Sequence, residues 1–393
     1  MSESENQTIS NTSTNTNIND TSTEKTNHNY PKIAIILSGD ADSLFWPRST
    51  KELPEQFVHL LENKTLFQRT YNTIKREVDK EDIWVVINEK HKHLALEQVQ
   101  DLDADRIITE PFGRHTAPAI GLALAILSQK YSDETIFCIF PSDHYIKNFE
   151  ELNFSMNIAI KAAYELKGLI TIGIEPDRPE THYGYIQYSD SKLDVKLNDE
   201  LYDAGLRYSI NFAEKPDKIT ARRFINSGDF VWNCGILVAR QDTLLEAYKK
   251  YLNYHYEQFN YLQHFIGTPE YEEELNKLYM TFNRISLDYG ILEHADNVYV
   301  VKSTFTWTDL HDWDELFRIS LKDALNNVLV GNVVVLESKN SLIISDEKPV
   351  CVLGMEDVIM INTEKAVLLC KRDASTKVAE LVDFLRKKNI PLY

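Results

Sequence analysis

Basic residues are scarce in this sequence of 393 residues, and long apolar runs are absent from it. Its 42 lysines and arginines stand against 60 aspartates and glutamates, which leaves a formal net charge of −18. Such a charge repels phosphate backbones and anionic lipid, so we expect no nucleic-acid partner and no membrane partner. A transmembrane helix needs about 18 apolar residues in a row, and the N-terminal residues lack the pattern of a signal peptide. We therefore expect a cytoplasmic protein.

Cysteine is rare as well. Cys138, Cys234, Cys351 and Cys370 lie far apart and form no CxxC pair. This spacing gives no sign of a zinc cluster or a disulfide framework. Because three of the four lie inside apolar runs, we expect small buried side chains in a reducing compartment.

The composition changes twice along the chain. Residues 1–30 are rich in Ser, Thr and Asn and cannot bury enough apolar area to offset their chain entropy, which predicts a disordered polar tail. Residues 325–393 hold closely spaced β-like runs followed by a helical pattern over 375–388. They predict a small β-rich C-terminal domain that ends in a helix. Its short runs fit a β-helix, a sandwich or a meander equally well.

Between these parts, residues 31–324 alternate short apolar runs with segments of helical period. This pattern predicts an α/β fold in which helices flank a mainly parallel sheet. The apolar runs are 33–37, 83–87, 135–140 and 169–174, and the clearest helical segments are 117–130 and 152–166.

Polar residues follow two of the predicted strands, where ligands bind in open α/β sheets. The first group is the loop 38–51, and the second is 141–144. Asp143 in the second group is placed to hold a divalent cation that also contacts phosphate oxygens. A helix or turn cap is an equally good interpretation of Asp143 on its own.

A series of short segments then appears in a characteristic order. Taken together they resemble the mannose-1-phosphate guanylyltransferase family, the GDP-mannose pyrophosphorylases, over residues 33–388. The ending resembles the short family form without a fused isomerase domain. The segments are WPxS at 46–49, PxQF at 54–57, EPFGRHTAPAI at 110–120, PSDH at 141–144, YGYI at 183–186, FAEKP at 212–216, WNCG at 232–235, SLDY at 286–289 and WTD at 307–309.

The resemblance implies a Rossmann-like, glycosyltransferase-A-like fold and the conversion of GTP and mannose 1-phosphate to GDP-mannose and pyrophosphate. The partners would be GTP or GDP-mannose and mannose 1-phosphate, with Mg²⁺ as the cofactor. The reaction is an in-line displacement, so catalysis consists of positioning two anions and neutralising the charge of the departing pyrophosphate. The apolar runs of the C-terminal domain fit either a homo-oligomer contact or a core of their own.

The resemblance also assigns roles to individual residues. Each has a simpler structural interpretation: a helix entry around residue 114, a β-bulge at Gly184, a surface ion pair of Glu214 with Lys215, and a cap for Asp288. The implied roles are nucleotide binding for Ser38, Gly39, Gly113, Arg114 and Thr116, sugar binding for Gly184, Glu214 and Asn233, sugar-phosphate binding for Lys215, and metal binding for Asp143 and Asp288.

The first loop departs from the family pattern. Leu44 stands where the family has Arg, Glu55 where it has Lys, and Asp40 and Asp42 where it has Gly. A unit charge about 5 Å from a phosphate oxygen contributes roughly 3 kcal/mol at an effective dielectric near 20, so these changes argue for weak or absent turnover. Asp40 and Asp42 also bring negative charge toward a bound phosphate, whereas glycines at these positions would leave backbone N–H groups free to bind it.

Two features could compensate for this loss. Arg48 and Lys51 follow in the same loop and are our candidates for replacement catalytic cations. Alternatively, Asp40 or Asp42 recruits a Mg²⁺ ion.

Three hypotheses result. The chain is a working guanylyltransferase, a catalytically impaired relative that binds a sugar nucleotide and regulates or scaffolds a partner, or a nucleotidyltransferase for another sugar 1-phosphate. The matched segments favour the first, and Leu44 and Glu55 favour the second.

Overall fold

The computed structural model describes residues 30–39, 43–60, 63–192 and 199–391. The predicted polar tail lies outside these residues except for Tyr30, and Asp40 and Asp42 of the first loop also lie outside them. No helix in the described ranges combines the length and the apolar character that a membrane span requires.

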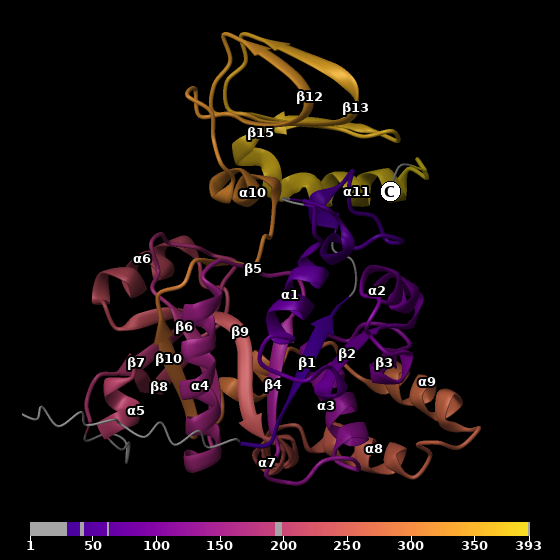
Figure 1. Ribbon diagram of the computed structural model, residues 1–393, viewed down its shortest axis with the longest axis vertical. Helices are drawn as coiled ribbons and strands as arrows, with labels where there is room; N and C mark the ends of the chain where they lie inside the picture. The colour runs from indigo at the N-terminus through magenta and orange to yellow at the C-terminus, as the bar shows by residue number, and fades with distance from the viewer. Residues whose placement is uncertain (1–29, 40–42, 61–62, 193–198, 392–393) are drawn as a thin grey trace, which may run out of the picture.

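A nine-stranded sheet forms the centre of the larger part of the molecule (Figure 1). Its spatial order is β3-β2-β1-β4-β9-β6-β10-β8-β7. The strands are β1 (Lys32–Ser38), β2 (Ile83–Asn88), β3 (Ile107–Glu110), β4 (Ile136–Pro141), β6 (Leu169–Ile174), β7 (Tyr185–Ser189), β8 (Leu206–Ala213), β9 (Phe230–Arg240) and β10 (Val298–Ser303). The short strands β5 (Tyr145–Ile146) and β11 (Trp307–Thr308) pair separately.

The α/β class is confirmed, but the sheet is mixed rather than mainly parallel. Strands β1 to β4 pair in parallel, as do β6 and β10. β9 lies antiparallel between β4 and β6, and β7 and β8 are also antiparallel to their neighbours. A buried apolar run has the same sequence pattern in either direction, which is why the sequence did not reveal this reversal.

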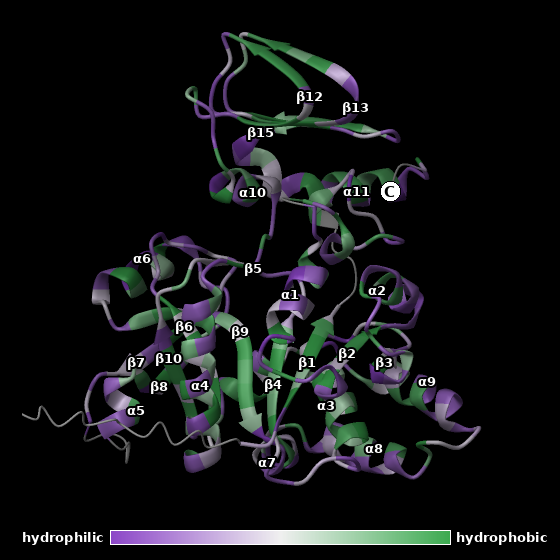
Figure 2. Ribbon diagram, in the orientation of Figure 1, coloured by the Kyte–Doolittle hydropathy of each residue, from purple (hydrophilic) through white to green (hydrophobic). Residues whose placement is uncertain are grey.

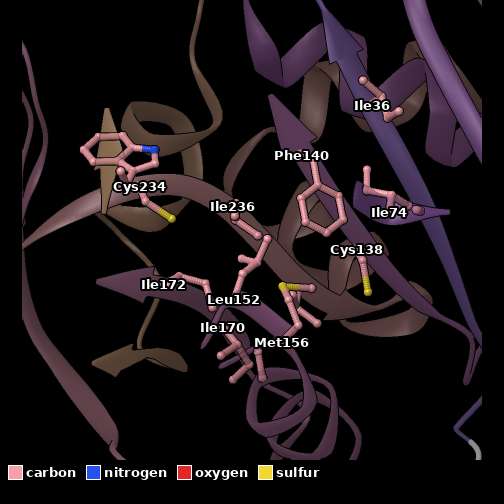
Figure 3. Packing of buried hydrophobic residues seen from close by; sticks show 14 of the residues in the cluster. Ile36, Ile74, Cys138, Phe140, Leu152, Met156, Ile170, Ile172, Cys234 and Ile236 are labelled. Carbon is pink, nitrogen blue, oxygen red and sulfur yellow. The ribbon is translucent and has the colours of Figure 1, made fainter. Parts of the chain in front are cut away.

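Helices cover both faces of the sheet because every central strand is apolar on both sides. Along β1, Ala34 and Ile36 pack toward one core and Ile33 and Ile35 toward the other. The first core lies against one set of helices, and Figure 3 shows part of it with Ile36, Cys138 and Met156. Figure 2 shows the apolar strands between the two helix layers. This set is α1 (Leu66–Ile74), α2 (Lys92–Gln98), α4 (Phe149–Leu166), α5 (Asp199–Asp203) and α6 (Lys218–Ser227); the opposite set is α3 (Thr116–Leu127), α7 (Gln241–Tyr251), α8 (Asn253–Gln263) and α9 (Tyr271–Thr281).

The C-terminal sheet is a coil of parallel strands. β12 (Val328–Leu336), β13 (Leu342–Leu353) and β14 (Val358–Asn362) pair in parallel although only a few residues connect them, and β15 (Val367–Lys371) closes the sheet antiparallel. Successive parallel pairing is the geometry of a β-helix, which decides among the three arrangements that the sequence left open. Close stacking is evident at Gly331, where an added Cβ would lie 1.9 Å from the carbonyl oxygen of Ser345.

A third core joins this domain to the rest of the chain. Phe45 and Trp46, from the loop after β1, pack with α10 (Trp313–Ile319), with the coil and with the terminal helix α11 (Val378–Lys387). The indole of Trp313 donates to the carbonyl of Trp46 at 3.0 Å. The C-terminal domain therefore rests on the loop that leads from β1 to the candidate site (Figure 1).

The cysteines follow the prediction only in part. Cys138 and Cys234 are buried, Cys370 is half-buried, and Cys351 is exposed. Cys351 lies on the outer side of β13, which also exposes Leu353, so its apolar neighbours do not indicate burial. A homo-oligomer contact at this apolar surface stays a prediction.

Candidate active site

A cavity of about 300 Å³ opens where several central strands end. Ser38 at the end of β1, Glu110 at the end of β3 and Pro141 at the end of β4 line it. β1 and β4 run in register, and the amide of Ser142 donates to the carbonyl of Leu37 at 3.0 Å. The two loops that we expected to form the site are therefore side by side.

The cavity brings many of the predicted residues together. Those that line it come from the nucleotide, sugar and metal groups alike. They are Ser38, Gly39, Gly113, Thr116, Asp143, Asn233 and Asp288, whereas Arg48, Lys51, Arg114, Gly184, Glu214 and Lys215 lie outside its lining.

Asp143 and Asp288 are the two proposed metal ligands. Asp143 follows β4, and 48% of its side chain is exposed. Asp288 begins the short helix η6 (Asp288–Leu292), and its Oδ1 accepts a hydrogen bond from Asn233 Nδ2 at 2.8 Å. Burial raises the pKa of Asp288, although the amide of Asn233 and the charge of Lys215 act in the opposite direction. Two carboxylates facing one cavity are a donor set that fits Mg²⁺.

A connected network lies behind Asp288. The backbone amide of Asn233 donates to the carbonyl of Gly184 at 2.8 Å, and the side-chain Oδ1 of Asn233 accepts from Thr171 Oγ1 at 2.6 Å. Thr171 and Asp288 thus supply partners for this half-buried amide, for which we had expected a sugar hydroxyl. An added Cβ at Gly184 would lie 2.7 Å from Glu214 Oε2, so the close approach of Glu214 accounts for this glycine.

Glu214 lies next to this network, close to Gly184 and Asp288. Burial raises the pKa of Glu214 to about 7, and the neighbouring charge of Asp288 adds to this effect. Lys215 lies beside it, with 3.9 Å between Nζ and Glu214 Oε1, and 63% of the lysine side chain is exposed. Lys215 is thus near both carboxylates although it does not line the cavity.

The opposite wall of the cavity belongs to the altered loop. Gln56 Nε2 donates to Ser38 Oγ at 3.1 Å and to the carbonyl of Gly39 at 3.0 Å, which fixes the end of β1. Glu55 lines the cavity and is only 7% exposed. Leu44 packs against the third core instead. The proposed recruitment of Mg²⁺ by Asp40 or Asp42 lies outside the described residues.

The structure places Arg48 and Lys51 outside the cavity lining. The guanidinium of Arg48 forms an ion pair with Asp346 of β13 and donates to the carbonyl of His59 at 2.9 Å. Lys51 is exposed and lies outside the cavity lining. Arg48 lies away from the cavity because it pairs with a carboxylate of the C-terminal domain. The sequence of the loop alone does not reveal this partner.

Arg114 is also engaged elsewhere. Its Nε donates to the carbonyl of Tyr279 at 3.0 Å, and its guanidinium lies 4.9 Å from the ring centroid of Phe112. Thr116 Oγ1 accepts from the amide of Leu287 at 2.9 Å, so its hydroxyl proton is available to a ligand. Arg114 therefore supports the wall that Gly113 and Thr116 present.

Sequence reasoning missed Arg284. Among the described residues that line the cavity, Arg284 is the sole lysine or arginine, facing the carboxylates Glu55, Glu110, Asp143 and Asp288. The amide of Ile285, next to it, donates to the carbonyl of Arg114 at 3.2 Å, which ties this segment to the loop between β3 and α3. Its signal in the sequence is weak: it stands four residues before Asp288, and only the fold shows where it lies.

Known proteins share both parts of the chain. A family model described as nucleotidyl transferase matches residues 33–326, and one described as MannoseP isomerase/GMP-like beta-helix domain matches residues 331–385. The chain is 32% identical over 362 residues to the alginate biosynthesis protein AlgA of Pseudomonas fluorescens, covering 90% of this chain and 71% of that protein. It is also 32% identical over 365 residues to a mannose-1-phosphate guanylyltransferase of Klebsiella pneumoniae, covering 90% and 74%. A crystal structure described as mannose-1-phosphate geranyltransferase from Thermus thermophilus is similar with a TM-score of 0.80 and 27% identity, covering 90% of this chain and 99% of that one.

Proposed function

We propose, from the premise that this chain belongs to the nucleotidyl transferase family, that it transfers a guanylyl group from GTP to mannose 1-phosphate and releases pyrophosphate. The resemblance to the mannose-1-phosphate guanylyltransferase family is confirmed by its relatives. One observation carries the proposal: Asp143 and Asp288 face the same cavity as Gly113 and Thr116. A nucleotide held by the glycine and threonine would present its phosphates to the carboxylates. We place this reaction in the cytoplasm.

The residues divide the work of an in-line displacement. Thr116 donates its hydroxyl to the nucleotide beside Gly113. Beyond the cavity lining but close to Asp288, Glu214 accepts hydrogen bonds from sugar hydroxyls while Lys215 binds the sugar phosphate. Holding both anions in this way aligns a phosphate oxygen of the sugar with the α-phosphorus.

The departing pyrophosphate needs positive charge. Arg284 lines the cavity and offers it, in place of the cations that the first loop has lost. Asp143 and Asp288 would hold Mg²⁺, which when bound neutralises phosphate charge. Asn233 keeps the carboxylate of Asp288 oriented toward the cavity through its 2.8 Å hydrogen bond.

A second function is favoured by Glu55. This carboxylate is buried at the cavity wall, where it repels a triphosphate more strongly than a diphosphate sugar. In this second function, the chain binds GDP-mannose without turnover and regulates or scaffolds a partner.

Purified protein mixed with GTP, mannose 1-phosphate and MgCl₂ tests both functions through pyrophosphate release. Turnover supports the first. Binding of GDP-mannose in calorimetry without turnover supports the second, and absence of both contradicts the two together. Replacing mannose 1-phosphate with glucose 1-phosphate, and GTP with ATP, serves as the specificity control and tests the hypothesis of a different sugar phosphate.

A further inference from the structure

Two loops outside the cavity bring three potential metal ligands together. Glu180 and His182 belong to the connection between β6 and β7, and His311 lies between β11 and α10. Each offers one ligand atom, and these atoms all lie within 4.8 Å of one another. The two loops also meet through the hydroxyls of Tyr183 and Thr308, which are 3.2 Å apart. None of the three ligands lines the cavity described above.

The imidazoles already lie face to face. The ring centroids of His182 and His311 are 4.4 Å apart with an interplanar angle of 20°. Around a tetrahedral ion with bonds near 2.0–2.1 Å, neighbouring donor atoms are about 3.3 Å apart. Binding an ion therefore requires the most distant of these donor atoms to approach by up to about 1.5 Å. Only 13% of His311 and 14% of Glu180 is exposed, whereas His182 at 45% leaves an open side for water.

Each ligand is oriented by a neighbour. His311 Nδ1 lies 2.7 Å from Asp309 Oδ1, an arrangement that directs the Nε2 lone pair away from the carboxylate. Metal-bound histidines commonly carry such a carboxylate partner. Glu180 Oε2 lies 3.3 Å from Arg178 Nε, while its Oε1 lies 3.0 Å from His182 Nδ1. Oε1 also accepts hydrogen bonds from the backbone amides of Thr181 and His182, at 2.8 Å and 3.3 Å, and is thus the oxygen directed at His182.

The local charge favours a cation. Asp309 Oδ1 lies 2.7 Å from His311 Nδ1, and the carboxylates of Asp312 and Glu180 also lie near this imidazole. These negative surroundings attract a divalent ion. The nearby cation Arg178 also pairs with Glu315 and Asp177, which offsets its charge.

We propose that Glu180, His182 and His311 bind a transition-metal ion of the Zn²⁺ class, which fastens the β6–β7 loop to the loop before α10. Two imidazoles and one carboxylate suit Zn²⁺ and its first-row neighbours, whereas Mg²⁺ prefers oxygen donors alone. The site is separate from the Mg²⁺ position proposed at Asp143 and Asp288, and it does not depend on the proposed function.

The test uses the full chain after removal of metal with a chelator. Titration with Co²⁺ is expected to give visible d–d bands that saturate at one equivalent per chain, and Zn²⁺ is expected to displace them. Binding of Zn²⁺ is also expected to raise the melting temperature. Absence of saturable binding would overturn the proposal, as would a thiolate charge-transfer band, which would place the ion on a cysteine.

Single substitutions identify the side chains that bind the ion. His182→Ala and Glu180→Gln are each expected to weaken Zn²⁺ binding at least tenfold, and Asp309→Asn about tenfold. His93→Ala removes a histidine of α2 far from these loops in the sequence and is the matched control, with unchanged affinity expected. His182 is the most exposed of the three ligands, so its variant remains informative if a His311 variant fails to fold. Equal affinity of His182→Ala and His93→Ala would overturn the assignment.

Discussion

The two ends of the cavity that we propose to hold the sugar and the phosphates, called the sugar end and the phosphate end, are built in opposite ways. At the sugar end, Asp288, Asn233, Thr171 and Gly184 are joined by hydrogen bonds. At the phosphate end, Glu55 occupies the position of a family lysine and Leu44 turns into a hydrophobic core. A hydrogen-bonded network loses several partners when one member changes, whereas a wall of separate charges can change one residue at a time. Among the described residues, Arg284 is the one lysine or arginine in the cavity lining, which also holds four carboxylates.

The largest effect is expected at the sugar end. Asp288→Asn removes one of the two proposed metal carboxylates and should lower kcat for pyrophosphate release, or Mg²⁺-dependent binding of GDP-mannose, by about 10² to 10³-fold. Because burial raises the pKa of Asp288, a neutral side chain is tolerated there and the melting temperature should change little. Asp296→Asn, in an exposed position, is the control. Full activity of Asp288→Asn would remove the metal assignment.

A gain of function is expected at the phosphate end. Glu55→Lys restores the family charge, and if one third of the roughly 6 kcal/mol change in interaction with phosphate is realised, kcat/KM rises about 30-fold. Glu52→Lys makes the same charge change at an exposed position outside the cavity lining and should have little effect. Equal responses of the two variants would show that long-range charge, rather than the cavity wall, limits turnover.

Glu214 gives the sugar end a pH dependence. Its folded pKa of about 7 lies above the ordinary value of 4.5, so its contribution to stability is present below pH 4.5 and is lost as the pH rises through 7. Glu214→Gln should therefore match the wild type near pH 4 and exceed its unfolding free energy by about 1 to 3 kcal/mol at pH 8. Unfolding of both proteins by denaturant at pH values between 4 and 8 measures the difference in unfolding free energy. The exposed Glu257→Gln should show no such trend, and a flat difference for Glu214→Gln would contradict the buried carboxylate.

The smallest effect is expected at Arg48. Its ion pair with Asp346 is partly exposed, so Arg48→Ala should lower the unfolding free energy by only about 0.2 to 1 kcal/mol. Turnover should remain within about twofold of the wild type, because Arg48 does not line the cavity. Lys51→Ala, at an exposed position of the same loop, should change neither quantity. A large fall in turnover for Arg48→Ala would restore our first interpretation of this residue as a catalytic cation.

Several features could be predicted from the sequence because they depend on local pattern. The apolar run 169–174 has the same bounds as β6, and the segment 152–166 lies within α4. The antiparallel direction of β9 could not be predicted, because the apolar pattern of a strand is the same in either chain direction.

At the site, we singled out Asp288 and Asn233 from the sequence, but neither Thr171 nor the hydrogen bonds that join the three residues. Asp288 and Asn233 are 55 positions apart, and nothing local indicates that they share a hydrogen bond. The same limit applies to Arg284 and to the pairing of His182 with His311, which lie on separate loops.

The sequence by itself determined the α/β class, the β-rich C-terminal domain, the edge of the sheet that carries the site, and the loss of charge at Leu44 and Glu55. These depend on the type and order of residues. Only the tertiary structure decided that Arg48 binds Asp346 and that Arg284 faces the cavity. The reason is physical: a side chain's charge is fixed by its chemistry, but the groups it meets are set by packing between segments that are distant along the chain.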